Sequence, residues 1–393
     1  MSDIVKAFVG AKIHDGQSLH DGHALLLRSD DSLSVVPRAS LPDACPTQYL
    51  QGGTISPGFV DLQVNGGGGV MFNDDQSVAT LRKIADAHLG TGTAAILPTL
   101  ITDTPERTTS AIDAVAEAIA QKVKGVVGIH LEGPHLSIAR KGAHDPQLIR
   151  PMTDDDLVVL LKAADHIPNV VVTVAPENTT FAQIKTMADA GIVVSLGHTD
   201  ADFETCMQAF AVGARCVTHL FNAMSQIGSR APGLVGAALA RDDIYAGLIA
   251  DSIHVHPSAI RVALAARQKS DRIFLVTDAM ATAGSQIDRF VLNGRDVFRA
   301  DHRLTLSDGT LAGADLAMPR AIKVMTTQAG DTIARAICRA TTMPTELLRE
   351  PGSLGRFDRG LESVVYFDET LTQATPLAKY LSGVDEDTLR RRW

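Results

Sequence analysis

The distribution of apolar residues predicts a repeating alternation of strands and helices from about residue 57 onward. Short apolar runs rich in Val, Ile and Leu begin at eight positions: Phe59, Ala94, Val126, Val170, Ile192, Cys216, Tyr245 and Ile273. Between several of these runs, apolar residues recur at helical spacing, most clearly over 77–90, 104–123 and 201–214. Alternating strands and helices are typical of a parallel sheet. Eight such units over roughly 220 residues therefore predict an α/β fold of the (β/α)8 TIM-like barrel type.

An open, doubly wound parallel sheet is the alternative that the same alternation allows. Sheets of that kind commonly carry a GxGxxG motif that opens the helix after the first strand. The segment after the first predicted strand reads NGGGG over 65–69 and is not such a motif. The barrel is therefore the preferred prediction.

Both chain ends have a different pattern from the middle. Residues 1–56 contain short apolar segments separated by Gly, Asp and Ser, which favours β structure. Near the other end, 333–348 has a helical pattern and 351–371 indicates a return to β structure. We therefore expect a small β domain built from 1–56 and 355–393, with the barrel spanning 57–354.

Composition and charge narrow the classes of partner. The chain has 393 residues, of which 45% are hydrophobic and 21% charged, and its formal net charge is −9. With an acidic balance and no run of Lys or Arg, we expect neither a nucleic-acid nor a membrane partner. No apolar run approaches the length of a spanning helix. The four cysteines show no CxxC spacing, so a reducing, cytoplasmic location is expected.

Polar residues stand at the ends of several predicted strands, where Val, Ile or Leu would be ordinary. They are Glu132, His198, His219, Asp251 and Asp278. The carboxyl-terminal ends of barrel strands meet at one mouth, and the catalytic residues of such barrels lie there. Two imidazoles and one carboxylate form a ligand set that leaves a coordination position open on a catalytic metal ion. Glu132, His198 and His219 are therefore the predicted metal ligands.

Several longer motifs give this arrangement a family context. They are PGFVDLQVNGGGG (57–69), HLEGPHLSIARKGAHDP (130–146), GHTDAD (197–202), THLFNAMS (218–225), GLIADSIHVHP (247–257), VTDAMATAG (276–284) and, more loosely, LAGADLAM (311–318). In this order the chain resembles the amidohydrolase superfamily and, within it, the N-acetylglucosamine-6-phosphate deacetylase family. The resemblance runs through essentially the whole predicted barrel and is weak in the terminal segments.

The resemblance implies roles for individual residues. Glu132, His198 and His219 would hold the metal, Asp278 would be the catalytic acid and base, and His144 would contact the acetyl group or its oxyanion. The expected substrate-binding residues are Asn222, Ala223, Arg230, His254, Gln63 and Asn65. Arg230 and His254 would bind phosphate across the interface of a homodimer. From the residues alone, the preferred interpretation of Arg230 is an ordinary solvated loop charge, and that of residues 66–69 is a flexible turn rather than a phosphate nest. A helix cap is the less favoured alternative for Asp278 and is compatible with a catalytic role.

The first predicted strand indicates how many metal ions to expect. Many amidohydrolases have HxH there, and the matching positions in this chain are Gln63 and Asn65. Because amides are poorer transition-metal ligands than imidazoles, we expect one divalent ion per chain. Zinc is the first expectation, while iron, cobalt and manganese can use the same ligands. His254 and His256 also form an HxH pair, but they follow the seventh strand, and we expect His256 to be structural.

The expected reaction is metal-dependent hydrolysis of the acetamide of N-acetyl-D-glucosamine 6-phosphate, which gives D-glucosamine 6-phosphate and acetate. Deacetylation of the galactosamine epimer and hydrolysis of another cyclic amide are alternatives within the same class. A non-catalytic barrel that binds sugar phosphates is an alternative from another class. The presence of all three ligands together with Asp278 favours an enzyme.

Overall fold

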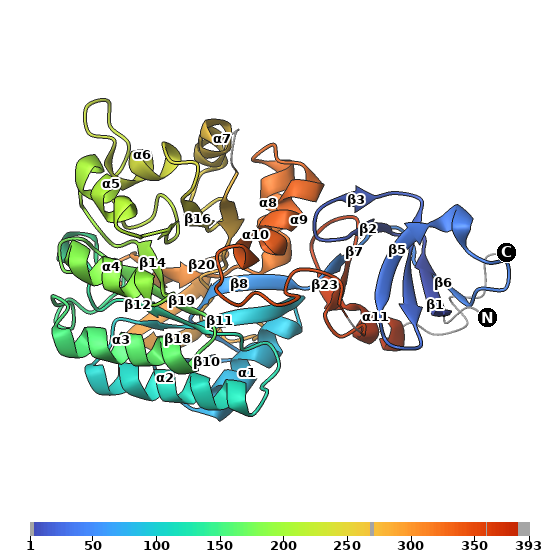
Figure 1. The fold of residues 1–393 in the computed structure, drawn as a ribbon, viewed down its shortest axis with the longest axis horizontal. Coiled ribbons are helices and arrows are strands. Elements are labelled where there is room, and N and C mark those ends of the chain that lie inside the picture. The colour runs from blue at the N-terminus through green and yellow to red at the C-terminus, as the bar shows by residue number, and fades with distance from the viewer. Residues whose placement is uncertain (1–3, 268–270, 359, 384–393) are drawn as a thin grey trace.

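A closed ring of parallel strands forms the centre of the molecule (Figure 1). The structure, a computed structural model, describes residues 4–267, 271–358 and 360–383. The eight-stranded sheet has the order β17-β16-β15-β14-β13-β12-β11-β8. Its strands are β8 (Phe59–Val64), β11 (Thr93–Ile101), β12 (Ile129–Glu132), β13 (Val170–Val174), β14 (Val193–Leu196), β15 (Cys216–Val217), β16 (Tyr245–Leu248) and β17 (Ile273–Leu275). Each falls within or beside one of the eight predicted apolar runs.

Contacts between the first and last strands close the ring. The backbone N–H of Asp278 donates to the carbonyl oxygen of Gln63 at 3.0 Å, and Val64 forms a parallel bridge with Ala279. These contacts exclude the open doubly wound sheet. The predicted TIM-like barrel is therefore confirmed.

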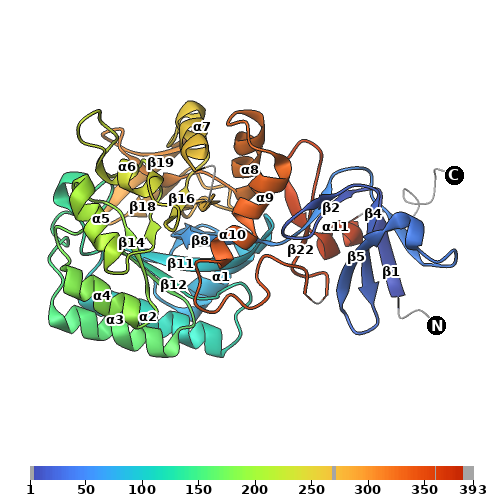
Figure 2. The same cartoon turned by 45° about the horizontal axis from the view of Figure 1, so that its top comes forward.

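Helices follow the strands and cover the outside of the ring, as Figure 2 shows. They are α1 (Val78–Leu89), α2 (Pro105–Ala120), α3 (Asp154–His166), α4 (Phe181–Asp189), α5 (Phe203–Ala211), α6 (Gly233–Leu239) and α7 (Pro257–Ala266), with α8 (Met318–Thr327), α9 (Ile333–Ala340) and α10 (Thr342–Thr345) later in the chain. Ser77 caps α1 and Thr104 caps α2, each accepting a backbone N–H with its side chain. Among the described residues, no helix combines the length and apolar character that crossing a membrane requires.

A smaller β unit contains strands from both chain ends (Figure 1). One sheet has the order β5-β4-β1-β6 and the other β23-β22-β7-β2-β3. The strands are β1 (Ile4–Val9), β2 (Lys12–His14), β3 (Leu19–His20), β4 (His23–Arg28), β5 (Leu33–Pro37), β6 (Thr47–Tyr49), β7 (Thr54–Pro57), β22 (Val364–Phe367) and β23 (Ala374–Pro376), followed by α11 (Leu377–Gly383). Because β22 pairs with β7, the predicted joining of the two ends is present. The domain boundaries at 56/57 and 354/355 stay a prediction.

An antiparallel sheet that the sequence analysis did not predict follows the last barrel strand. It consists of β18 (Arg289–Leu292), β19 (Arg295–Ala300), β20 (Arg303–Leu306) and β21 (Leu311–Ala314). Ala314 forms a parallel bridge with Ala279, directly after Asp278. The inserted sheet is thereby fixed to the mouth of the barrel.

Candidate metal centre and active-site pocket

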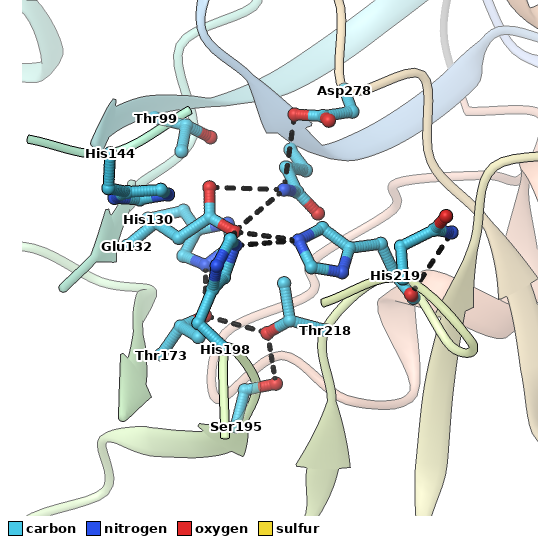
Figure 3. A network of polar contacts seen from close by, with 12 residues as sticks. Thr99, His130, Glu132, His144, Thr173, Ser195, His198, Thr218, His219 and Asp278 are labelled. Carbon is cyan, nitrogen blue, oxygen red and sulfur yellow. Dashed lines mark hydrogen bonds and ion pairs between the residues drawn. The ribbon is translucent and has the colours of Figure 1, made fainter. Parts of the chain in front are cut away.

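The three predicted metal ligands converge at the carboxyl-terminal mouth of the barrel (Figure 3). Glu132 ends β12, while His198 and His219 each follow the end of a strand, β14 and β15 respectively. Nε2 of His219 lies 3.0 Å and Nε2 of His198 lies 3.2 Å from Oε1 of Glu132. The two Nε2 atoms are 3.1 Å apart. Ligands about 2.0–2.1 Å from one tetrahedral ion would lie roughly 3.3 Å from each other, so these separations suit a shared ion.

The hydrogen-bonding chemistry of the cluster also fits a cation. Nδ1 of His198 lies 2.8 Å from the carbonyl oxygen of Arg140, to which it must donate. In the neutral ring, Nε2 then carries a lone pair that faces the carboxylate of Glu132. The lone pair of this nitrogen and the negative carboxylate are buried together, and a positive charge between them is needed to offset their repulsion. These residues therefore fit a divalent metal ion.

The pKa values of Glu132 and His219 also indicate that the cluster favours a bound positive charge. Burial alone would raise the pKa of Glu132, but hydrogen bonds and charges from His198 and His219 outweigh it and hold this pKa well below its usual value. Burial opposes protonation of His219, yet the hydrogen bond and charge of Glu132 raise its pKa. Without an ion, the cluster draws a proton to itself.

Several residues at the mouth have left-handed backbone conformations. The φ angles are 46° at His198, 32° at His219 and 50° at Asp278. A non-glycine residue in this region carries strain of about 1–2 kcal/mol. Such strain persists where the surrounding structure fixes the conformation, and it concentrates at functional sites.

The amides of Gln63 and Asn65 contact carboxylates rather than the pocket wall. Nδ2 of Asn65 donates to Oδ1 of Asp278 at 2.7 Å. Nε2 of Gln63 lies 3.2 Å from the same oxygen and 3.3 Å from both carboxylate oxygens of Glu132. Both amides are buried, and neither residue lines the pocket described below. Their donors are therefore directed to the two carboxylates, and the expectation that these residues bind substrate stays a prediction.

Asp278 has the electrostatic environment of a group that exchanges protons. Burial and the negative charge of Glu132 raise the pKa of Asp278 to about 6, against the opposing charge of His219 and the hydrogen bond from Asn65. A carboxyl group with a pKa near neutrality can both accept and donate a proton. No helix begins after Asp278 within the described residues that follow it up to β18, so the helix-cap interpretation is wrong.

His144 lies beside the ligand cluster. Its ring centroid is 4.3 Å from that of His198, and its Nδ1 is 2.7 Å from Oγ1 of Thr102. Burial, followed by the charge of His198, lowers the pKa of His144 to about 3. The ring is therefore neutral. The single Thr102 hydroxyl proton has two acceptors, the carbonyl oxygen of Glu132 at 3.4 Å and the nearer Nδ1 of His144. When it is donated to Nδ1, Nε2 of His144 carries the ring proton and can serve as a hydrogen-bond donor.

A cavity of about 390 Å³ opens over these groups. This volume lies in the usual range for small-molecule sites. The structure brings most of the predicted residues together in its wall: Glu132, His144, His198, His219, Asn222, Ala223, His254 and Asp278. Arg230 is not among them, and it lies on an exposed loop over 226–231.

His254 belongs to the pocket of its own chain. Oδ2 of Asp251 lies 2.7 Å from Nδ1 of His254, and Oδ1 of the same carboxylate accepts the His254 backbone N–H. His254 therefore lines the pocket of its own chain, and its expected contact across a dimer interface stays a prediction. His256 accepts the backbone N–H of Ser258 and caps α7, which confirms its expected structural role.

The pocket also contains residues to which the sequence analysis gave no role. The inserted sheet contributes Thr310, Leu311 and Gly313 to the wall. Arg140 lines the wall as well, with its guanidinium paired to Asp200 at 2.7 Å. Arg140 and Gly313 lie inside motifs quoted above, so the motifs marked these segments without indicating what each side chain does.

Comparisons with known proteins agree with this architecture. The model of the Amidohydrolase family matches residues 54–362. The chain therefore belongs to the amidohydrolase family. The N-acetylgalactosamine-6-phosphate deacetylase of Shewanella sp. (strain ANA-3) is 42% identical over 318 residues, which cover 81% of this chain and 80% of that protein. The N-acetylglucosamine-6-phosphate deacetylase of Haemophilus influenzae is 34% identical over 357 residues, which cover 90% and 92%.

Solved structures give the same relationship. The crystal structure of N-acetylglucosamine-6-phosphate deacetylase from Pasteurella multocida has a TM-score of 0.86 and 36% sequence identity, and the match covers 94% of this chain and 96% of that one. The resemblance to amino-sugar-phosphate deacetylases that the motifs indicated is confirmed.

Proposed function

We propose that this protein is a metal-dependent deacetylase that hydrolyses the acetamide of N-acetyl-D-glucosamine 6-phosphate to D-glucosamine 6-phosphate and acetate. One observation carries the proposal: Glu132, His198 and His219 converge on one point at a pocket whose wall also holds the carboxylate of Asp278. A non-catalytic sugar-phosphate binder has no need of this combination. The relationship to deacetylases of both phosphorylated N-acetyl hexosamines supports the substrate class.

The metal centre would hold one divalent ion between Glu132, His198 and His219. Such an ion supplies Lewis acidity towards the amide carbonyl and makes water more acidic. Zinc suits two imidazoles and one carboxylate, and iron, cobalt and manganese can use the same ligands. Two ions are not expected, because the amide nitrogens of Gln63 and Asn65 face the carboxylates as hydrogen-bond donors.

Asp278 would move the proton. Its carboxylate takes a proton from the attacking water as oxygen bonds to the acetyl carbon. It then delivers that proton to the sugar nitrogen as the C–N bond breaks, so the amine leaves neutral. The donors of Asn65 and Gln63 hold the carboxylate in place between these two steps.

His144 would stabilise the carbonyl oxygen as negative charge develops on it. The neutral ring lies in the pocket wall beside His198. Its Nδ1 contact with Thr102 can fix the tautomer that carries a proton on Nε2. Pre-positioned donors of this kind act mainly in the transition state, where the charge is greatest.

The phosphate would bind at the opposite part of the pocket, contacted by Asn222, Ala223 and His254. Asp251 orients His254 through the contact with its Nδ1. Arg230 would complete this site from the neighbouring subunit of a homodimer, since it does not reach the pocket of its own chain. We propose a cytoplasmic enzyme, in line with the free cysteines.

A second candidate substrate is N-acetyl-D-galactosamine 6-phosphate, favoured by the 42% identity to the Shewanella protein. Acetate release should be measured with both phosphorylated epimers and with unphosphorylated N-acetylglucosamine, before and after treatment with a chelator. The proposal predicts faster release from N-acetylglucosamine 6-phosphate than from the other two, abolished by the chelator. Faster release from the galactosamine epimer would assign the second candidate. No release from any of the three would refute both.

A further inference from the structure

A chain of buried hydroxyl groups crosses the barrel interior directly beneath the metal ligands (Figure 3). Oγ1 of Thr173 on β13 lies 2.6 Å from Oγ1 of Thr218, which follows β15. The Thr218 oxygen lies 2.7 Å from Oγ of Ser195 on β14. At the other end, Nε2 of His130 on β12 lies 2.7 Å from the Thr173 oxygen. All four residues are at most 4% exposed, so each proton must be placed on a protein partner.

The contacts of His130 set the direction of this chain. Nδ1 of His130 lies 3.0 Å from the carbonyl oxygen of Leu62, which can only accept, so Nδ1 carries a proton. Both ring nitrogens contact uncharged groups, and in the neutral ring Nε2 accepts from Thr173. Because the single hydroxyl proton of Thr173 is donated to His130, the Thr173 oxygen can only accept from Thr218, so Thr218 donates to Thr173. Ser195 in turn donates to Thr218.

The row of hydrogen-bonded hydroxyl groups lies against the residue that precedes each histidine ligand. Thr218 itself precedes His219, whose backbone is left-handed. Gly197 precedes His198, which is also left-handed. A Cβ added at Gly197 would lie 2.8 Å from Cγ2 of Thr173 and 2.9 Å from Cβ of Thr218. The two threonines therefore occupy the space beneath both strained ligands.

We propose that the Thr173–Thr218 hydroxyl pair, oriented by His130 and extended by Ser195, is a positioning device that holds His198 and His219 in metal-binding geometry. This inference rests on the proposed metal site. None of the four residues would touch metal or substrate; they act through the backbone of the ligands. Strained conformations need surroundings that fix them, and hydrogen bonds that tie β12, β13, β14 and β15 together at this level provide such surroundings.

Paired substitutions can separate this role from simple packing. Thr173→Val and Thr218→Val keep the side-chain shape but remove a hydroxyl and leave a neighbouring polar group unpaired. Thr173→Ser and Thr218→Ser keep the hydroxyl chain but remove a methyl group from the core. Thr93→Val is the matched control, because Thr93 is a buried barrel threonine whose Oγ1 has no hydrogen-bond partner.

The readouts are the Zn²⁺ dissociation constant of the metal-free full chain, measured by chelator competition, the visible spectrum of its Co²⁺ form, and the melting temperature. The two Val variants should bind Zn²⁺ about tenfold more weakly, at the lower limit known for outer-shell changes, with altered Co²⁺ bands. The Ser variants should melt at lower temperature but bind Zn²⁺ within about twofold of the wild type, and Thr93→Val should match the wild type.

Wild-type metal affinity and an unchanged Co²⁺ spectrum in both Val variants would overturn the positioning role, whatever their melting temperatures. Failure of the wild type itself to bind metal would instead refute the proposed function. Should the Val variants not fold, two further measurements decide. Ser195 is the last member of the row of hydroxyl groups, and Ser195→Ala should weaken Zn²⁺ binding about threefold. Nitrogen NMR of histidine-labelled wild type should show His130 protonated at Nδ1, and a proton at Nε2 alone would overturn the proposal.

Discussion

The side-chain amide of Asn65 donates to the carboxylate of Asp278 across 2.7 Å, although 213 residues separate them in sequence. This contact joins the first barrel strand to the loop that follows the last one. It stabilises the charged form of Asp278 and lowers its pKa, against burial and the charge of Glu132. Asn65 therefore affects when the proposed general base is available.

Asn65→Ala should move the acidic limb of the pH–rate profile upward. The base works only when ionised, so activity falls as pH drops through its pKa. Removing a donor to the carboxylate raises that pKa, by about half a unit or more. A bound cation lowers it, so the wild-type limb should lie at or below pH 6, the value for Asp278 without metal. The measurement is kcat/KM from pH 4.5 to 8. Asn73→Ala, which removes a buried amide bound to Asp103, is the control. An unshifted limb in Asn65→Ala would contradict the assignment.

Asp278→Asn should retain metal and fold but lose turnover. The amide copies the shape of the carboxylate but cannot shuttle a proton, and loss of general acid–base catalysis costs roughly 10²–10⁴-fold. Metal content and the circular dichroism spectrum check that the variant is otherwise intact. Near-normal kcat in a metal-loaded variant would show that another group moves the proton.

How much of this site the sequence could predict depends on how local each signal is. Glu132 ends an apolar strand, and His198 and His219 each follow one, so the order of the strands alone predicts that the three residues meet at one mouth. The partners of Gln63 and Asn65 lie 69 to 215 residues away, and no local pattern indicates where those amide donors point. The contact between His254 and Asp251 spans only three residues, but the sequence pattern does not indicate that this contact directs His254 into the pocket of its own chain.

The sequence of the inserted sheet contains one strong local signal for β structure. Asn293–Gly294 separates β18 from β19, and Asn293 has a φ of 49° and Gly294 of 73°. Asn-Gly between two β segments is a strong indication of a hairpin. The strands β18 and β19 are half exposed and contain three Arg and one Asp among their ten residues, so their hydrophobic pattern is weak. Because of this weak pattern, apolar runs predict the barrel strands but not the strands of the inserted sheet.

The stability of Asp61→Asn relative to that of the wild type should increase as pH rises. Burial raises the pKa of Asp61 from its usual value of 3.8 to about 7, despite hydrogen bonds from Thr277 and Gln63. Between these two pH values, Asp61 of the wild type is protonated in the folded state but ionised in the unfolded state. The free energy of unfolding of the wild type therefore falls as pH rises from about 4 to 7. Asparagine has no such dependence.

The melting temperature of Asp61→Asn minus that of the wild type, measured without metal, should therefore be more positive at pH 8 than at pH 5. Taking the difference removes the titration of all other groups common to both proteins. A difference that is constant over this range would show that Asp61 is ionised in the folded protein throughout.

Arg230→Ala should raise KM for the phosphorylated substrate while leaving the slower reaction of unphosphorylated N-acetylglucosamine nearly unchanged. A charge-assisted hydrogen bond contributes roughly 1.5–3 kcal/mol, or about tenfold to a hundredfold in affinity. If Arg230 acts across a dimer, mixing Arg230→Ala chains with Asp278→Asn chains should restore part of the activity, because one site per heterodimer carries neither lesion. No restoration in heterodimers verified by mass spectrometry would exclude the shared site.

Titration of the metal-free protein with Zn²⁺, with acetate release from N-acetylglucosamine 6-phosphate as the readout, tests the central claim most directly. Activity should be absent before metal is added, rise in proportion to Zn²⁺ and stop rising at one equivalent per chain. His219→Ala, which removes one of the three ligands, should bind Zn²⁺ weakly and stay inactive. Full activity in the metal-free protein, or activity that rises until two equivalents are bound, would contradict a single catalytic ion held by Glu132, His198 and His219.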